Sequence, residues 1–116
     1  MFSVQCCSIK TRFTELTVFA GSKARLTCNA TQWSDDVSLI IWYRGITGKP
    51  LISSTSPNSD GHSPDPTKYY FDATSDPSVF IIDHLTESDS GDYRCRIDYR
   101  LSRTRNYVVR LNVIGK

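Results

Sequence analysis

The chain has 116 residues, of which 39% are hydrophobic, 22% charged and 11% aromatic, and its formal net charge is +2 at pH 7. This length fits one ordinary domain that can bury a core without a metal or a partner chain. The apolar content is too high for an intrinsically disordered chain, and no run of about 18 apolar residues is present to span a membrane. The net charge is too small to indicate nucleic-acid binding by the chain as a whole.

Apolar and polar residues alternate through several short segments that are rich in aromatic and β-branched side chains. A period of two places each apolar set on one face of a half-buried strand. Turn signals at residues 20–22, 45–48, 76–77 and 90–91 separate the segments, which predicts an all-β sandwich or barrel without an internal repeat. The alternating sets are Ala24, Leu26 and Cys28; Ile40 and Trp42; Phe80 and Ile82; Tyr93, Cys95 and Ile97; and Val109, Leu111 and Val113.

Residues 53–66 read SSTSPNSDGHSPDP and contain no apolar side chain except proline. Because nothing in this segment can fill a core, we expect a long exposed loop or a frayed edge, most simply a connector. The alternative is a recognition loop at the rim of a binding face. Strand pairing is expected to resume at residues 68–71.

The two ends of the chain suggest its organisation. We expect residues 1–13 to form a pre-domain segment and residues 14–114 to form the domain, whose last strand finishes at residue 114. Residues 1–20 contain three charged side chains and no long apolar stretch, so they do not resemble a secretory signal peptide. The simplest interpretation is one module of a larger protein, or an incomplete gene model.

The cysteines and one tryptophan give the strongest motif. Trp42 lies between Cys28 and Cys95, and the second cysteine ends the run DSGDYRC at residues 89–95. This combination is the signature of the immunoglobulin fold. The long interval between the cysteines leaves room for strands C′ and C″, so we predict a variable-type (V-set) β-sandwich of two antiparallel sheets. A disulfide between Cys28 and Cys95 would join the sheets against Trp42, and closing so long a loop is worth roughly 4 kcal/mol.

Three further positions of the same motif have expected roles at the corner before the second cysteine. The Tyr93 hydroxyl is expected to hydrogen-bond the backbone, and Gly91 allows the tight turn. Asp89 is expected to pair with a basic residue near the start of the strand at residues 68–71, where Lys68 is the candidate.

The remaining cysteines and the histidines do not form a recognisable site. Cys6 and Cys7 are most simply part of the pre-domain segment, and a bond to another part of a longer chain is the alternative. His62 and His84 lack the spacing of metal ligands. No nucleophile elbow, phosphate-binding loop, EF-hand or HExxH motif is present. We therefore predict a domain that is not an enzyme and that takes no cofactor, metal, small-molecule substrate or nucleic acid.

Positive charge concentrates in residues 94–110, which hold six arginines and one aspartate. With Trp42, Tyr93 and Cys95 pointing inward, alternation turns the residues between and beside them outward on one sheet, the sheet of strands G, F, C and C′. This outward face mixes arginine and tyrosine with Ile41 and Val108, a composition that is typical of an interface core. The alternative is a face that is merely solvated. We expect central partner contacts from Tyr43, Arg94, Arg96, Asp98 and Arg110, and rim contacts that include Arg103 and Arg105.

The single Asn-x-Ser/Thr match lies at residues 29–31. Asn29 follows the inward-facing Cys28, so it should point outward from the opposite sheet. If the chain is exported, we predict a glycan on Asn29, which would leave the sheet of the predicted contacts free of sugar.

The runs at residues 91–106, 110–114 and 41–44 resemble the first immunoglobulin domain of the arthropod Sidestep family. The resemblance spans roughly residues 14–114. It implies the extracellular part of a larger membrane protein at the cell surface, acting as ligand for an immunoglobulin-superfamily receptor of the Beaten path type in axon guidance or synaptic partner choice. The alternative is a secreted or receptor-type immunoglobulin domain of another lineage, either immune-like or binding glycosaminoglycans.

Overall fold

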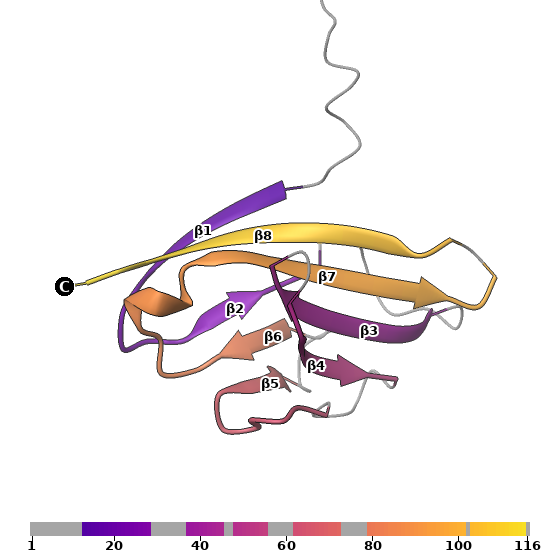
Figure 1. Cartoon of the computed structure of the whole chain (residues 1–116), viewed down its shortest axis with the longest axis horizontal. Helices are drawn as coiled ribbons and strands as arrows, with labels where there is room; N and C mark the ends of the chain where they lie inside the picture. The colour runs from indigo at the N-terminus through magenta and orange to yellow at the C-terminus, as the bar shows by residue number, and fades with distance from the viewer. Residues whose placement is uncertain are drawn as a thin grey trace, which may run out of the picture.

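The chain folds into eight β-strands and one turn of 3₁₀ helix within residues 13–28, 37–45, 48–55, 62–72, 79–101 and 103–115, which the structure, a computed structural model, describes (Figure 1). The strands follow the alternating segments of the sequence, because aromatic and β-branched residues suit a pleated, half-buried surface. The elements are β1 (Phe13–Phe19), β2 (Ala24–Leu26), β3 (Val37–Arg44), β4 (Pro50–Ser54), β5 (Tyr69–Asp72), β6 (Val79–Ile82), η1 (Glu87–Asp89), β7 (Gly91–Tyr99) and β8 (Arg105–Ile114).

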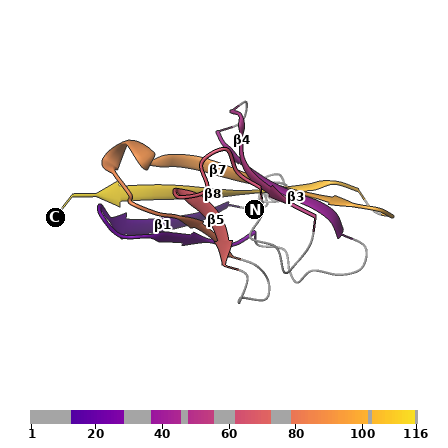
Figure 2. The same ribbon diagram turned by 90° about the horizontal axis from the view of Figure 1, so that it is seen from below.

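The strands form two sheets packed as layers (Figures 1 and 2). The larger sheet has the order β1-β8-β7-β3-β4, and the smaller has the order β2-β6-β5. Strands β8, β7, β3 and β4 correspond to G, F, C and C′ of the variable-type sandwich, which confirms the predicted fold. One pairing departs from the antiparallel arrangement that we expected, because β1 runs parallel to β8.

The predicted disulfide joins Cys28 to Cys95 and links the two layers, with their Cα atoms 5.8 Å apart. Trp42 lies in the core beside it and is 1% exposed. The Trp42 ring also meets Phe80 of the smaller sheet, with ring centroids 5.1 Å apart. Aromatic contacts of this kind add to the stabilisation that comes from buried apolar area.

A strict alternation along β7 separates its core side chains from its outward ones. Tyr93, Cys95 and Ile97 are buried, whereas Arg94 and Arg96 are half exposed. The neighbouring strand β8 alternates in the same way, with every second residue from Tyr107 to Val113 buried. One face of the larger sheet therefore belongs to the core, and the other carries the polar and charged residues.

The corner between η1 and β7 is held by hydrogen bonds and one ion pair. The Tyr93 hydroxyl donates to the carbonyl oxygen of Asp89 at 2.6 Å. The Asp89 carboxylate accepts from Lys68 Nζ and from the backbone amide of Thr86, both at 2.8 Å. Gly91 has φ = +147°, a conformation that side chains rarely adopt. The corner thus ties β7 to the start of β5, as the motif indicates.

Arg44 completes this corner, although the sequence analysis did not single it out as a structural residue. Its guanidinium donates to the carbonyl oxygens of Ser88 at 2.8 Å and Ser90 at 2.7 Å. The same group lies 5.2 Å from the centre of the Tyr93 ring. By donating to one carbonyl within η1 and one just after it, Arg44 attaches the end of β3 to this corner.

The prediction of an exposed loop over residues 53–66 is wrong at its start. Ser53 and Ser54 are the last residues of β4, where they pair with Ile41 and Ile40, and Ser54 is only 7% exposed. Strand pairing is made by the backbone, so a small polar side chain can end a strand and still pack against the core. In the described residues, a single bridge between Ser53 and His62 stands where strand C″ was expected.

We predict that Asp89→Asn lowers the free energy of unfolding at pH 7 by about 2–4 kcal/mol, because it leaves Lys68 without its partner at a half-buried site. Burial alone would raise the pKa of Asp89, but the hydrogen bonds from Lys68 and Thr86 and the charge of Lys68 bring this pKa below its ordinary value. The ionised carboxylate therefore stabilises the fold above about pH 4, and this contribution is lost as the pH falls through the lower folded pKa.

Urea unfolding between pH 7 and pH 2.5 checks this prediction. The variant should lose stability less steeply at acid pH than the parent chain. Glu87→Gln, an exposed change in the same helical turn, is the control and should shift stability by less than about 0.5 kcal/mol. Equal acid sensitivity in the parent and in Asp89→Asn would contradict the assignment.

Candidate functional site

The outward side of the larger sheet carries the residues predicted to bind a partner, and we call this surface the GFCC′ face. It combines charged, aromatic and aliphatic side chains from three adjacent strands. In the described part of the chain its central members are Ile41 and Tyr43 of β3, Arg94, Arg96 and Asp98 of β7, and Val108 and Arg110 of β8.

A row across the middle of the face joins Tyr43, Arg94 and Val108, which are paired in the strand register. The Arg94 guanidinium lies over the Tyr43 ring, 4.2 Å from the ring centre. Its Nη1 also donates to Oδ1 of Asn106 at 2.8 Å. The guanidinium is therefore oriented by an aromatic ring on one side and by an amide on the other.

Arg96 and Asp98 form a second fixed group beside this row. Arg96 donates to the two Asp98 carboxylate oxygens at 2.9 and 3.3 Å. The Thr104 hydroxyl donates to the same carboxylate at 2.9 Å. The hydrogen bond and charge of Asp98, with a further hydrogen bond to Tyr43, raise the pKa of Arg96. Asp98 thus connects β7 to the start of β8 across the turn between them.

Arg110 is paired with Asp92, at 2.9 Å from Nε to Oδ1. The hydrogen bond and the charge of Asp92 raise the pKa of Arg110. Two of the predicted central arginines, Arg96 and Arg110, thus have carboxylate partners on the same face. The sequence window of residues 94–110 hid this balance, because Asp92 lies just before it and faces Arg110 only through the β7–β8 register.

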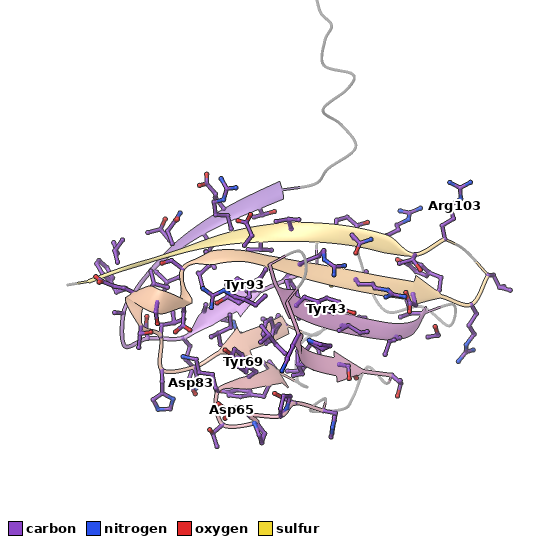
Figure 3. The ribbon with its side chains drawn as sticks, in the orientation of Figure 1. Tyr43, Asp65, Tyr69, Asp83, Tyr93 and Arg103 are labelled. Carbon is purple, nitrogen blue, oxygen red and sulfur yellow. A yellow bond between two sulfur atoms is a disulfide. The ribbon has the colours of Figure 1, made fainter. Side chains whose placement is uncertain are left out.

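Exposed arginines gather near the turn between β7 and β8, whose described residues 100–101 and 103–104 we call the F–G turn. Arg100 and Arg103 are exposed there, Arg105 is exposed where β8 begins, and Leu101 is 89% exposed. Figure 3 shows the Arg103 side chain pointing away from the sandwich at this end. The structure thus separates the predicted central contacts from the predicted rim contacts.

The outward side of the smaller sheet has a different character. Arg25 pairs with Asp72 at 2.8 Å. Asp83 accepts from the Tyr70 hydroxyl at 2.7 Å, and this hydrogen bond is the main reason that the pKa of Asp83 is lowered. Lys23 lies 3.7 Å from the same carboxylate. Figure 3 shows Asp83 on this side of the sandwich, away from Tyr43 and Arg103.

Some predicted residues lie outside the described part of the chain, namely Asn29 of the expected glycosylation site and the pair Cys6 and Cys7. Among the described residues, no group of three or more histidine, cysteine, aspartate or glutamate side chains could hold a metal ion. The same part of the chain contains no helix long and apolar enough to cross a membrane.

Sequence reasoning missed the residues that hold the arginines in place, which are Asp92, Asn106 and Thr104. The alternation along β7 and β8 puts Asp92 and Asn106 on the GFCC′ face, so this signal was present in the sequence. Their partners could be named only once the register between the two strands was known.

Three features define an immunoglobulin-type domain: the two packed sheets, the Cys28–Cys95 disulfide beside Trp42, and the corner held by Tyr93. The protein-family model of the immunoglobulin V-set domain matches residues 12–114 of the sequence, and the chain belongs to this family. No curated protein matches the chain.

Solved structures share the fold at low sequence identity. Murine CEACAM1b superposes with a TM-score of 0.67 at 13% identity, over 85% of this chain and 50% of that chain, so the present domain spans half of that structure. The extracellular domain of the voltage-gated sodium channel β4 subunit gives a TM-score of 0.63 at 21% identity, over 90% and 93% of the two chains. The first immunoglobulin domain of ZIG-8 gives a TM-score of 0.63 at 22% identity, over 93% of this chain and 83% of that chain.

We predict that the fold does not depend on the central arginines. The ion pairs of Arg96 and Arg110 are half exposed, the hydrogen bond from Arg94 to Asn106 is also exposed, and exposed pairs contribute about 0–1 kcal/mol. Arg94→Ala, Arg96→Ala and Arg110→Ala should each change the free energy of unfolding by less than about 1 kcal/mol, as measured by urea unfolding. A loss of several kcal/mol in any one of them would show that its role is structural.

Proposed function

We propose that this domain is a non-enzymatic recognition module of the cell surface that binds a protein partner through the GFCC′ face. The observation that carries the proposal is the fixed Arg94–Tyr43 stack beside the Arg96–Asp98 pair, set among the aliphatic side chains of Ile41 and Val108. Arginine and tyrosine are, with tryptophan, enriched at the energetic centre of protein interfaces.

These side chains are held in one conformation before a partner binds, which supports the proposal. A long side chain that is immobilised on binding costs about 0.5–1.5 kcal/mol. Arg94 and Arg96 are already held by Asn106, Tyr43 and Asp98, so less of this cost remains when a partner arrives. Each guanidinium has five N–H donors, and those not used within the face can bond to a partner.

The resemblance to the Sidestep family supplies the class of partner, an immunoglobulin domain of a Beaten path type receptor in axon guidance or synaptic partner choice. The fold neighbours support a role in adhesion more generally. The sodium channel β4 extracellular domain forms parallel homodimers and acts in cell–cell adhesion, and the first immunoglobulin domain of ZIG-8 forms a homodimer. An immune-like domain of another lineage would use a different receptor.

The central and rim positions should behave differently in a complex with a receptor domain found by screening this domain against extracellular receptor domains. Arg96→Ala should cost about 2–5 kcal/mol of binding and speed dissociation, because it leaves a desolvated Asp98 without its partner. Arg103→Ala should mainly slow association and weaken the salt dependence, because its charge acts at long range. Surface plasmon resonance at several salt concentrations measures both rate constants.

The control for this experiment is Arg25→Ala on the smaller sheet, which also removes an arginine from an exposed ion pair. It should leave both rate constants unchanged. The proposal fails if Arg94→Glu combined with Arg96→Glu leaves the affinity unchanged while Arg25→Ala abolishes binding.

The exposed arginines near the F–G turn favour a second candidate function, the binding of sulfated polysaccharide. Such binding would rest on charge alone, so heparin retention should collapse between about 0.1 and 0.5 M salt. Arg103→Ala combined with Arg105→Ala should reduce retention on a heparin column, whereas Arg25→Ala should not. Retention that survives 0.5 M salt would contradict this candidate.

A further inference from the structure

Strand β1 forms one edge of the larger sheet and is the least protected of the sheet edges in the described residues (Figure 1). It is seven residues long, pairs with β8 in an unbroken register and contains one charged residue, Glu15. The edge strands of the smaller sheet, β2 and β5, have only three and four residues. The remaining edge, β4, begins with Pro50, has a register shift against β3 and is bridged by His62. Short strands, proline and irregular register keep an exposed edge from pairing with another chain, and β1 has none of these features.

The free side of β1 carries backbone donors and acceptors at every second residue. The Ala20 amide, just after the strand, donates to the Ile114 carbonyl at 2.8 Å. The backbone groups of a strand alternate in direction, so every second residue back from Ala20 also points toward β8. Glu15 and Thr17 lie between these residues, and their N–H and C=O groups therefore point to the free edge. In the described part of the chain no other element bonds to these groups.

We propose that two copies of this domain pair edge to edge through β1, in antiparallel orientation, with Glu15 of one copy opposite Thr17 of the other. In this register each Glu15–Thr17 pair exchanges two N–H···O bonds. The two Leu16 side chains lie opposite each other at the two-fold axis, and each already packs against its own core. The donors and acceptors of β1 thus match those of a second β1, as a two-fold interface requires.

The two neighbouring registers are less favourable. If Glu15 faced Glu15, like charges would lie directly opposite each other, which is destabilising. If Thr17 faced Thr17, Glu15 would lie opposite Phe19. The Phe19 carbonyl already accepts from the Ser22 amide at 3.3 Å and from the Ser22 hydroxyl at 2.6 Å, so it has little capacity for a further donor. The register with Glu15 opposite Thr17 is therefore the one that uses the free backbone groups of both residues.

The paired edges would form a small contact that leaves the GFCC′ face open. Seven residues at about 3.3 Å each give a contact roughly 23 Å long and one strand wide. This is much less than the roughly 800 Å² per partner of a stable interface, so the association is weak and transient. A two-fold axis perpendicular to the sheet keeps both GFCC′ faces on the same side of one continuous sheet. Pairing and receptor binding use different surfaces, so either can fail without the other.

The first measurement is amide hydrogen exchange of the whole chain by NMR, from about 0.05 to 3 mM, a range that suits a transient interface. The Glu15 and Thr17 amides should exchange rapidly at the lowest concentration. Their exchange should slow by at least about twofold as the concentration rises, because pairing protects them by mass action. The Leu16 and Val18 amides point toward β8, so they should exchange slowly at every concentration and serve as controls within the same strand.

The second measurement tests the register with variants of the exposed Thr17, read as the dimer dissociation constant by diffusion NMR. Thr17→Lys places two lysines opposite two Glu15 carboxylates and should tighten pairing by about two- to thirty-fold. Thr17→Glu places like charges opposite each other and should weaken it. The matched controls are Thr67→Lys and Thr67→Glu, at an exposed threonine in the turn before β5, and they should leave pairing unchanged. Circular dichroism verifies that every variant is folded.

The proposal is overturned if the parent chain stays monomeric at the highest concentration. It is also overturned if the Glu15 and Thr17 amides are equally protected at all concentrations, because the edge would then be covered within one copy. Association that leaves these two amides in rapid exchange would place the contact elsewhere on the molecule. Weaker pairing of Thr17→Lys would contradict the register, because lysines would then face each other.

Discussion

The bond between Cys28 and Cys95, packed against Trp42, fixes which way every side chain of β7 points. Cys95 must face the smaller sheet to reach Cys28, and strand alternation then turns Arg94 and Arg96 away from the core. A slip of the strand register by one residue would bury both guanidinium groups. The free-energy cost of burying an unpaired charge is far larger than the stabilisation that one strand pairing provides. The same phase delivers Tyr93 to the core at the corner, where its hydroxyl reaches the Asp89 carbonyl. The packing of the core therefore determines which residues of β7 lie on the GFCC′ face.

The contacts among the outward side chains serve order more than stability. The Arg96–Asp98 and Arg110–Asp92 pairs are half exposed, so water and salt weaken them, and the fold gains little from them. They do restrict long side chains to one geometry across three strands. Thr104 extends this restraint to the base of the F–G turn through the Asp98 carboxylate. On this surface the polar side chains hold one another in place, and aliphatic side chains lie between them. Such a surface is better suited to contact with protein than to solvation.

Residue spacing was enough to predict the parts of the molecule that depend on local order or on a long-range motif. Cys28, Trp42, Tyr93 and the Lys68–Asp89 pair follow from positions that recur in this fold. Two other features could not be predicted in this way. Ser54 is buried because β4 pairs through its backbone, and a hydropathy pattern does not register backbone pairing. Asp92 balances Arg110 because the two residues face each other across strands, whereas counting charge along a window measures only sequence neighbours.

Arg44 shows the same limitation in another way, since its partners are backbone carbonyls rather than side chains. Every residue has a carbonyl, so no pattern of residue types marks those that accept a hydrogen bond from an arginine. Only the fold brings Ser88 and Ser90 to the end of β3. The corner is consequently anchored from both layers, by Lys68 beside β5 and by Arg44 in β3, and the sequence motif contained only the first of these anchors.

The two groups of arginines would act at different stages of the proposed receptor encounter. Arg103 and Arg105 are exposed near the F–G turn, so their charge would act at a distance and speed the approach of a partner. The central arginines would contribute through contacts made only after docking, and such contacts determine how fast a complex dissociates. On this proposal, receptor preference depends on the centre of the GFCC′ face, and the rate of encounter depends on the charges beside the F–G turn.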